Sequence, residues 1–224
     1  MSPSKPLGAK DLPAADSLND RGVFVISLAG KRIGTENFEI RATDNSIEAE
    51  GNIEMRVQQE GKTLEFRSSS KLVLDSALRP LTYSWNQKGA QSSKLEIDFQ
   101  ASPAKVRYKT VTGEEDARDF ELPKDVVVLD DNVFHHYQLI AQKYLRNGSA
   151  KQTFPAFVPQ EALPGALVVQ DAGPDPAEVG GHKQTLRHLV FSTELKQIDL
   201  WVDEQGRVER IYISDAQLDA LRKR

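Results

Sequence analysis

Residues 47–58 read Ile-Glu-Ala-Glu-Gly-Asn-Ile-Glu-Met-Arg-Val-Gln, and this stretch decides the fold class. Every odd position is apolar or glycine, and every even position is polar. Successive side chains of a β-strand point to opposite faces, so this alternation predicts a strand with one dry face and one wet face. Strands buried on both faces of a parallel sheet would be continuously apolar. The stretch therefore predicts an antiparallel sheet that is wetted on one side.

The same alternation continues along the first half of the chain, interrupted by residues that tolerate a positive φ, such as Gly30, Asn45 and Gly61. Together the alternation and the turns predict a long antiparallel meander. Its expected strands lie at 21–29, 33–42, 46–58, 62–75, 79–88, 91–100, 104–111 and 116–121.

The alternation stops after residue 129, where a helix is expected at 131–146. Side-chain oxygens of Asp130, Asp131 and Asn132 are suited to capping its first N–H groups. Val133, Tyr137, Ile140, Ala141 and Tyr144 share one face at helical spacing, and Asn147-Gly148 follows as a stop signal.

The last third of the chain is predicted as loops at 154–164 and 171–181, because both are rich in Pro or Gly. Short strands are expected at 165–170, 185–191, 195–202 and 207–213. Asp215 is expected to cap a short C-terminal helix that runs to Leu221.

So many strands with one dry face cannot stay open and flat. We therefore expect a mainly β domain over 21–224, whose antiparallel meander curls into a barrel or half-barrel around the central helix. Residues 1–20, rich in Pro, Ala and Ser, are expected to form a flexible N-terminal lead.

Composition excludes several classes of function. The chain has 224 residues, no cysteine and a formal net charge of -4. Disulfides, thiol catalysis and cysteine-bound zinc are therefore excluded, and nucleic acid is not an expected partner. No stretch is apolar over the roughly 20 residues that span a bilayer. The lead is typical of a tether behind a removed signal segment, which predicts a periplasmic or membrane-tethered location, with the cytoplasm as the alternative.

The order of a meander, a helix and further strands resembles the half-barrel of bacterial lipoprotein carriers of the LolA/LolB type. The stretches VISLAGKRIGT at 25–35 and DDNVFHHY at 130–137 are also similar to those of uncharacterised bacterial envelope proteins. The resemblance covers the architecture and residues 21–150. It implies a location in the cell envelope and a concave face able to accept an acyl chain.

The densest group of chemically capable side chains lies at the start of the predicted helix. Asp131 and His135 are four residues apart, which on a helix places carboxylate and imidazole on one face. With His136 they could bind a divalent metal or act as a base and its orienting group. The structural alternative, in which the aspartates cap the helix and the histidines pack or face water, is preferred, because no further ligand is located.

Aromatic residues are expected near the helix and the sheet interior, either as core or as the lining of an apolar pocket. Those predicted as ligand-binding residues are Tyr83, Trp85, Phe99, Tyr108, Phe134, Tyr137 and Phe157. The segment 154–159 is the expected lid. Ser68, Ser69 and Ser70 lie outside any nucleophile elbow, and the acidic cluster at 114–116 is expected in a solvated turn.

These features predict a noncatalytic envelope protein that holds a lipid or other apolar molecule in the concave face, without a cofactor. Two alternatives stay open. One is a metal-assisted hydrolase using Asp131, His135 and His136, and the other is a structural module that binds another envelope protein.

Overall fold

The computed structural model describes residues 18–223 except 60, 89–91 and 111. Its first half is a meander of eight strands: β1 (Asp20–Leu28), β2 (Lys31–Ala42), β3 (Ser46–Gln59), β4 (Lys62–Asp75), β5 (Pro80–Lys88), β6 (Ser93–Asp98), β7 (Ala104–Lys109) and β8 (Glu115–Phe120). These bounds agree with the alternating stretches of the sequence to within a few residues.

The second half contains the helix and seven further strands. In chain order these elements are β9 (Val127–Val128), α1 (His135–Asn147), β10 (Lys151–Val158), the short 3-10 helix η2 (Pro159–Glu161), β11 (Leu163–Val179), β12 (His182–Ser192), β13 (Gln197–Val202), β14 (Val208–Ile213) and β15 (Leu218–Lys223).

All fifteen strands belong to one sheet, in the order β8-β7-β6-β5-β4-β3-β2-β1-β15-β14-β13-β12-β11-β10-β9. Neighbouring strands are antiparallel except β9 and β10, which pair in parallel. The first and last described strands lie side by side in the middle of the sheet, from Val23 opposite Lys223 to Leu28 opposite Leu218. Because β8 and β9 are its two edges, the sheet is not closed, and the prediction of a half-barrel is confirmed.

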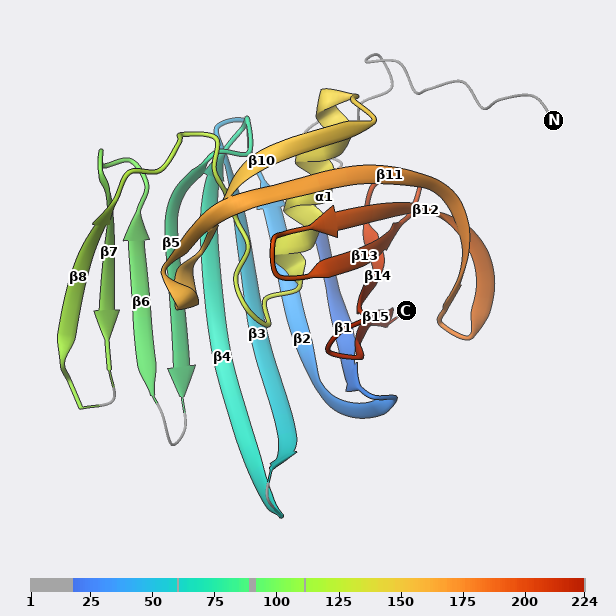
Figure 1. Ribbon diagram of the computed structural model, residues 1–224, viewed down its shortest axis with the longest axis horizontal. Coiled ribbons are helices and arrows are strands. Elements are labelled where there is room, and N and C mark those ends of the chain that lie inside the picture. Colours follow the sequence, from blue (N-terminus) through green and yellow to red (C-terminus); the bar gives the residue numbers. More distant parts are fainter. Residues whose placement is uncertain (1–17, 60, 89–91, 111, 224) are drawn as a thin grey trace.

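The curled sheet wraps around α1, with β1 to β5 on one side of the helix and β10 to β13 on the other (Figure 1). Ten consecutive residues of the helix, from His135 to Tyr144, are buried. The helix ends as predicted, because Gly148 adopts φ 68° and closes the last turn.

The helix begins at His135 and not at residue 131, so this prediction is wrong by one turn. No side chain of the preceding segment caps it. Instead, the Glu36 carboxylate from β2 accepts a hydrogen bond from the His135 backbone N–H at 3.0 Å. The cap is therefore supplied by a residue distant in sequence, which the local pattern of aspartates cannot reveal.

Two predicted loops are strands in the structure. The segment 154–164 consists of the end of β10, η2 and the start of β11, and 171–181 lies mostly in β11. Beyond Gln170, β11 has β12 as its partner and no longer pairs with β10. Pro174 and Pro176 lie in this edge portion, where a missing N–H costs no ladder hydrogen bond.

The predicted C-terminal helix is also wrong, because residues 218–223 form β15. Leu218 and Ala220 point to the dry side and are buried, and they pair with Leu28 and Ile26 of β1. Pairing on both edges, with β1 and with β14, overrides the local helical preference of this segment.

One large apolar cluster fills the space between α1 and the sheet. A smaller cluster, Ala177, Val179, Leu186 and Trp201, lies at the far end of the β11–β12 hairpin. Trp201 donates a hydrogen bond from Nε1 to Asp175 at 2.8 Å and stacks on His188 at 4.9 Å. This second cluster closes the C-terminal half of the sheet on its outer side.

Candidate functional site

The start of α1 is bound to the sheet through a buried carboxylate. Glu36 and His135 are both 0% exposed, and the Glu36 Oε1 atom lies 2.8 Å from His135 Nδ1. Because the other Glu36 oxygen accepts the His135 backbone N–H, the carboxylate fixes both the ring and the helix end. Gly51 makes this possible, since a Cβ there would lie 2.6 Å from His135 Cε1 and 2.9 Å from Glu36 Oε1.

A second buried carboxylate, Asp130, holds the segment ahead of the helix. Its Oδ2 atom accepts the Tyr83 hydroxyl at 2.5 Å, and its Oδ1 atom accepts the backbone N–H groups of Asp131 and Gln160. Burial raises the pKa of Asp130 to about 6, against the opposing effect of these hydrogen bonds. Burial and the neighbouring Asp130 charge also raise the pKa of Tyr83 well above its ordinary value.

His136 lies between these two anchors. Its ring packs edge-on against Tyr83 and His135, with centroids 5.5 and 4.7 Å away. Burial, together with the neighbouring His135, holds the pKa of His136 well below its ordinary value, so the ring is neutral near pH 7.

Two buried polar atoms beside Gly51, His135 Nε2 and Ser70 Oγ, have no hydrogen-bond partner among the described residues. A carboxylate-oriented imidazole beside a serine is the arrangement of a base and its nucleophile. Here both imidazoles are 0% exposed, so no substrate can reach them from solvent. The cluster joins the helix to the sheet, and we assign it no catalytic role.

Asp131 is not part of this cluster. It precedes the helix, so the predicted four-residue helical spacing to His135 is absent. Its carboxylate lies 3.3 Å from Lys196 Nζ, and its interaction with Glu161 raises the pKa of that neighbour. In the part of the chain that the structure describes, no group of three or more His, Asp or Glu side chains is placed to hold a metal ion.

The predicted ligand-binding aromatics lie within or against the apolar core. Tyr83, Trp85, Phe134, Tyr137 and Phe157 are buried, and Phe99 and Tyr108 are partly buried against them. The expected lid is mainly strand β10, and its Phe157 is 0% exposed against Phe120. These rings fill the space beside α1, and their role in ligand binding stays a prediction.

The dry face is uncovered at one end. His135 lies against Gly51, so α1 begins at the level of Gly51 and Ser70, while β3 and β4 continue beyond it as far as Gln59 and Lys62. Burial of β3 falls along this direction. Ile53 is 1% exposed, whereas Met55 and Val57 are only half-buried.

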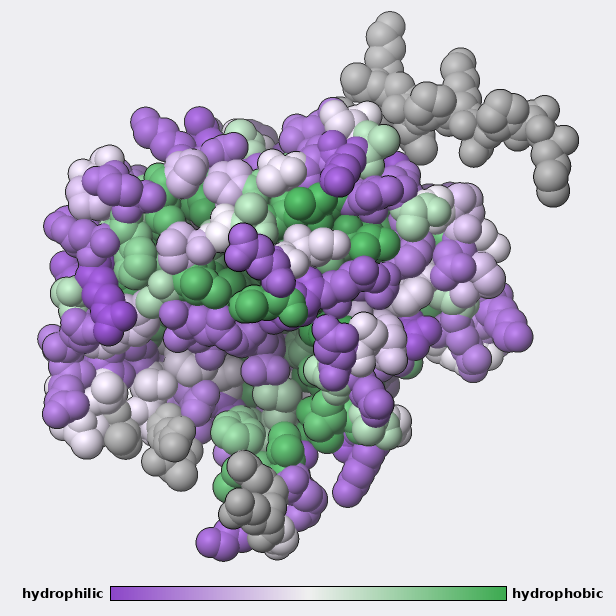
Figure 2. Space-filling model, in the orientation of Figure 1, coloured by the Kyte–Doolittle hydropathy of each residue, from purple (hydrophilic) through white to green (hydrophobic). Residues whose placement is uncertain are grey.

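The partners of these residues on β4 follow the same trend. Phe66 and Leu64, which lie opposite Met55 and Val57, are half-buried on the same face. Figure 2 shows apolar side chains at this end of β2–β4, below the level of the helix. We call Met55, Val57, Leu64 and Phe66 the open apolar face.

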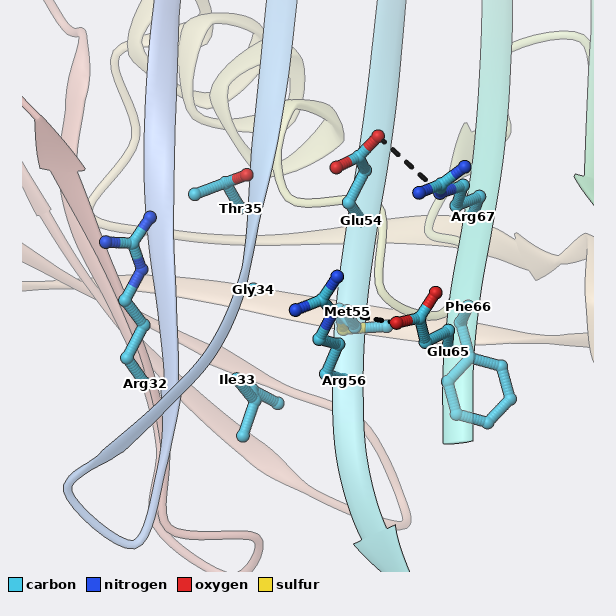
Figure 3. A pocket seen from close by; sticks show the side chains of 10 residues that line it. All are labelled: Arg32, Ile33, Gly34, Thr35, Glu54, Met55, Arg56, Glu65, Phe66 and Arg67. Atoms are coloured by element: carbon cyan, nitrogen blue, oxygen red, sulfur yellow. Dashed lines mark ion pairs between the residues drawn. The ribbon is translucent and has the colours of Figure 1, made fainter. Parts of the chain in front are cut away.

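The opposite face of the same strands is charged. A groove of about 310 Å³ lies beside the end of the β2–β3 pairing. Its lining consists of the charged residues Arg32, Glu54, Arg56, Glu65 and Arg67, of Ile33, Gly34 and Thr35, and of Met55 and Phe66 from the open apolar face (Figure 3). Arg56 pairs with Glu65 at 3.0 Å and Arg67 with Glu54 at 3.8 Å. Because these charges are paired and wet, we place no apolar ligand in this groove.

Sequence reasoning missed Glu36 and did not single out the open apolar face. A signal for Glu36 exists in the sequence. It shares a strand face with Phe38 and Ile40, so it is a charged residue at a position where the alternation predicts an apolar one. Met55 and Val57 lie at odd, apolar positions of the alternating stretch 47–58, which predicts that they point to the dry face. The level at which the helix stops covering that face depends on tertiary packing and has no local signal.

No family model matches this chain, and no curated protein does. The structure is similar to the crystal structure of a β-barrel-like protein of the domain of unknown function DUF1849 from Brucella abortus, with a TM-score of 0.62 and 10% identity over 92% of this chain and 95% of that chain. A DUF1089 family protein from Pseudomonas aeruginosa is similar at a TM-score of 0.49 and 16% identity, covering 78% of this chain and 87% of that chain. The first likeness establishes a β-barrel-like fold and, at this identity, the fold alone.

Among the described residues, no helix combines the length and the apolar character that crossing a bilayer requires.

Proposed function

We propose that the protein is a noncatalytic binding protein for a lipid or another molecule with an apolar chain, which lies on the open apolar face. The observation that carries this proposal is the loss of cover along the dry face beyond Gly51. There, four large apolar side chains on two paired strands are left half-buried. Contiguous apolar surface that is partly exposed in this way typically marks a binding site.

The site differs in place from the pocket expected beside the helix. The aromatic residues there are packed against one another, whereas the open apolar face borders solvent at the end of a concave sheet. Apolar ligands of curved sheets favour such mouths, because the chain is removed from water without displacing packed core residues.

Phe66→Asp tests the proposal. It puts a charge in the middle of the open apolar face, and binding of an apolar fluorescent dye or of an extractable lipid is expected to weaken about tenfold or more. Thr63→Asp is the matched control. Thr63 lies three positions away on the same strand, points to the wet face and is exposed.

The proposal fails if wild-type protein binds neither dye nor lipid, or if the two variants weaken binding equally. Circular dichroism and a urea midpoint within error of wild type show that Phe66→Asp is folded.

A cell-envelope location belongs to this proposal, because the resemblance to lipoprotein carriers implies it. Molecules with acyl chains are also abundant in the envelope. Fractionation of cells that express the full gene tests the location.

A structural module that binds another envelope protein is the competing proposal, and the filled interior around α1 favours it. It predicts a protein partner in pull-downs and no lipid in purified protein.

A further inference from the structure

The open apolar face ends in two lysines. Lys62 begins β4, and it shares a face with Leu64 and Phe66, because alternate residues of a strand point the same way. Lys31 begins β2 opposite Leu28. Leu28 pairs with Leu218, and two residues earlier on β1 Ile26 pairs with Ala220. Ile26 and Ala220 are buried on the dry face, so Leu28 points to that face as well.

Both ammonium groups are therefore on the dry side of the sheet, at its solvent edge. Lys31 and Lys62 are exposed, and neither is within ion-pair distance of a carboxylate among the described residues. This contrasts with the wet face, where Arg56 and Arg67 pair with Glu65 and Glu54. On the dry face, the positions between Ile53 and the lysines are apolar, so no described side chain there balances their charge.

The distance along the strand suits an amphiphile. From Met55 to the level of Lys62, which pairs with Gln59, β3 advances four residues, or about 13 Å at the usual rise of a strand. A hydrocarbon chain lying on Met55, Val57, Leu64 and Phe66 would thus bring its polar end to the level of Lys62.

We propose that the ligand is a single-chain anionic amphiphile, a long-chain carboxylate, whose head group pairs with Lys62 and is attracted by Lys31 at the end of the β1–β2 hairpin. This inference rests on the proposed function, because it names the ligand of the same site. A carboxylate would be attracted by the two lysines, which pair with no carboxylate among the described residues, whereas a quaternary ammonium head would be repelled.

The test compares ligands that share one chain and differ in head-group charge. Dodecanoate, dodecanol and dodecyltrimethylammonium compete with an apolar dye, each below its micelle concentration. The order dodecanoate, dodecanol, dodecyltrimethylammonium is expected for wild type, with the preference for dodecanoate decreasing at high salt.

The double variant K31Q/K62Q is expected to lose about three- to tenfold in affinity for dodecanoate, the effect of one exposed ion pair and a second attractive charge, and to bind dodecanol unchanged. Lys88→Gln is the control. Lys88 lies at the same end of the sheet but opposite Arg67 on the wet face, so it is expected to leave all three affinities unchanged.

Equal binding of the three ligands, with loss of all three in Phe66→Asp, would overturn the anionic ligand and keep the apolar site. Failure of every ligand to bind would overturn both. Binding that appears only with vesicles of anionic phospholipid, and not with monomeric dodecanoate, would identify a membrane surface and also overturn this proposal.

Discussion

The Glu36 carboxylate of β2 binds the ring and the backbone N–H of His135, a residue 99 positions later that begins α1. Both residues are 0% exposed. One acid in the core thus joins α1 to the sheet. Removal of that acid should therefore destabilise the whole fold.

Glu36→Ala is expected to lower the free energy of unfolding by about 3 kcal/mol, because it leaves a buried imidazole and a helix N–H without partners. Urea unfolding followed by circular dichroism measures this loss. Glu39→Ala is the control, since Glu39 is exposed on the same strand, and its effect should stay within about 0.5 kcal/mol. Equal effects of the two substitutions would contradict the anchoring role.

Gly51→Ala is expected to destabilise the protein by about 2 kcal/mol, because the new methyl group would lie 2.6 Å from the His135 ring. Gly165→Ala provides the comparison. A Cβ at Gly165 meets nothing within 4 Å, so that variant should be neutral or slightly stabilised. Thermal or urea unfolding of the two variants distinguishes a close approach at Gly51 from a general glycine effect.

Stability should depend on pH through two opposing groups. The pKa of Asp130 is raised from 3.8 to about 6 in the folded protein, so the folded state holds the proton more tightly. Asp130 therefore adds roughly 3 kcal/mol to the free energy of unfolding below pH 4, and this contribution is lost as the pH rises through 6. The pKa of His136 is lowered, so its contribution is present above pH 6.5 and is lost on acidification.

Asp130→Asn removes the contribution of Asp130 to the pH dependence and leaves the contribution of His136. The variant should therefore lose stability more steeply than wild type when the pH falls from 7 to 5, as measured by urea titrations at both values. Parallel pH profiles for variant and wild type would show that Asp130 does not titrate in this range.

Arg222→Ala is expected to cost about 2 to 3 kcal/mol, because Arg222 binds the nearly buried Asp20 carboxylate with two hydrogen bonds of 2.8 and 2.6 Å. This ion pair links β15 to β1. Arg118→Ala removes a similarly short but exposed pair with Asp116 and should change stability by less than about 1 kcal/mol. Chemical denaturation of both variants checks the difference.

The meander could be predicted because its physical cause is local: alternation and turn residues specify each strand of the first half. The helix could be placed for the same reason, and its stop at Gly148 was correct. Its start could not, because the residue that caps it is Glu36, far away in sequence.

The second half was less predictable. Pro174 and Pro176 are typical of loops, and a strand is possible there because beyond Gln170 β11 pairs with β12 and no longer with β10. The segment 218–223 becomes a strand because β1 and β14 are available on either side. Of the candidate site, the aromatic residues lie within or against the apolar core, and their role in ligand binding stays a prediction; Asp131 and the histidines were not brought together.

The pairing of β1 with β15 has a consequence for biosynthesis. The ribosome makes residues 20–28 early, yet their second neighbour appears only when residues 218–223 leave the exit tunnel. Until then the N-terminal meander carries an unsatisfied edge, and such an edge favours association with other nascent chains. Pairing between strands so far apart in sequence also slows folding, so the sheet should be completed late and benefit from a chaperone that shields that edge.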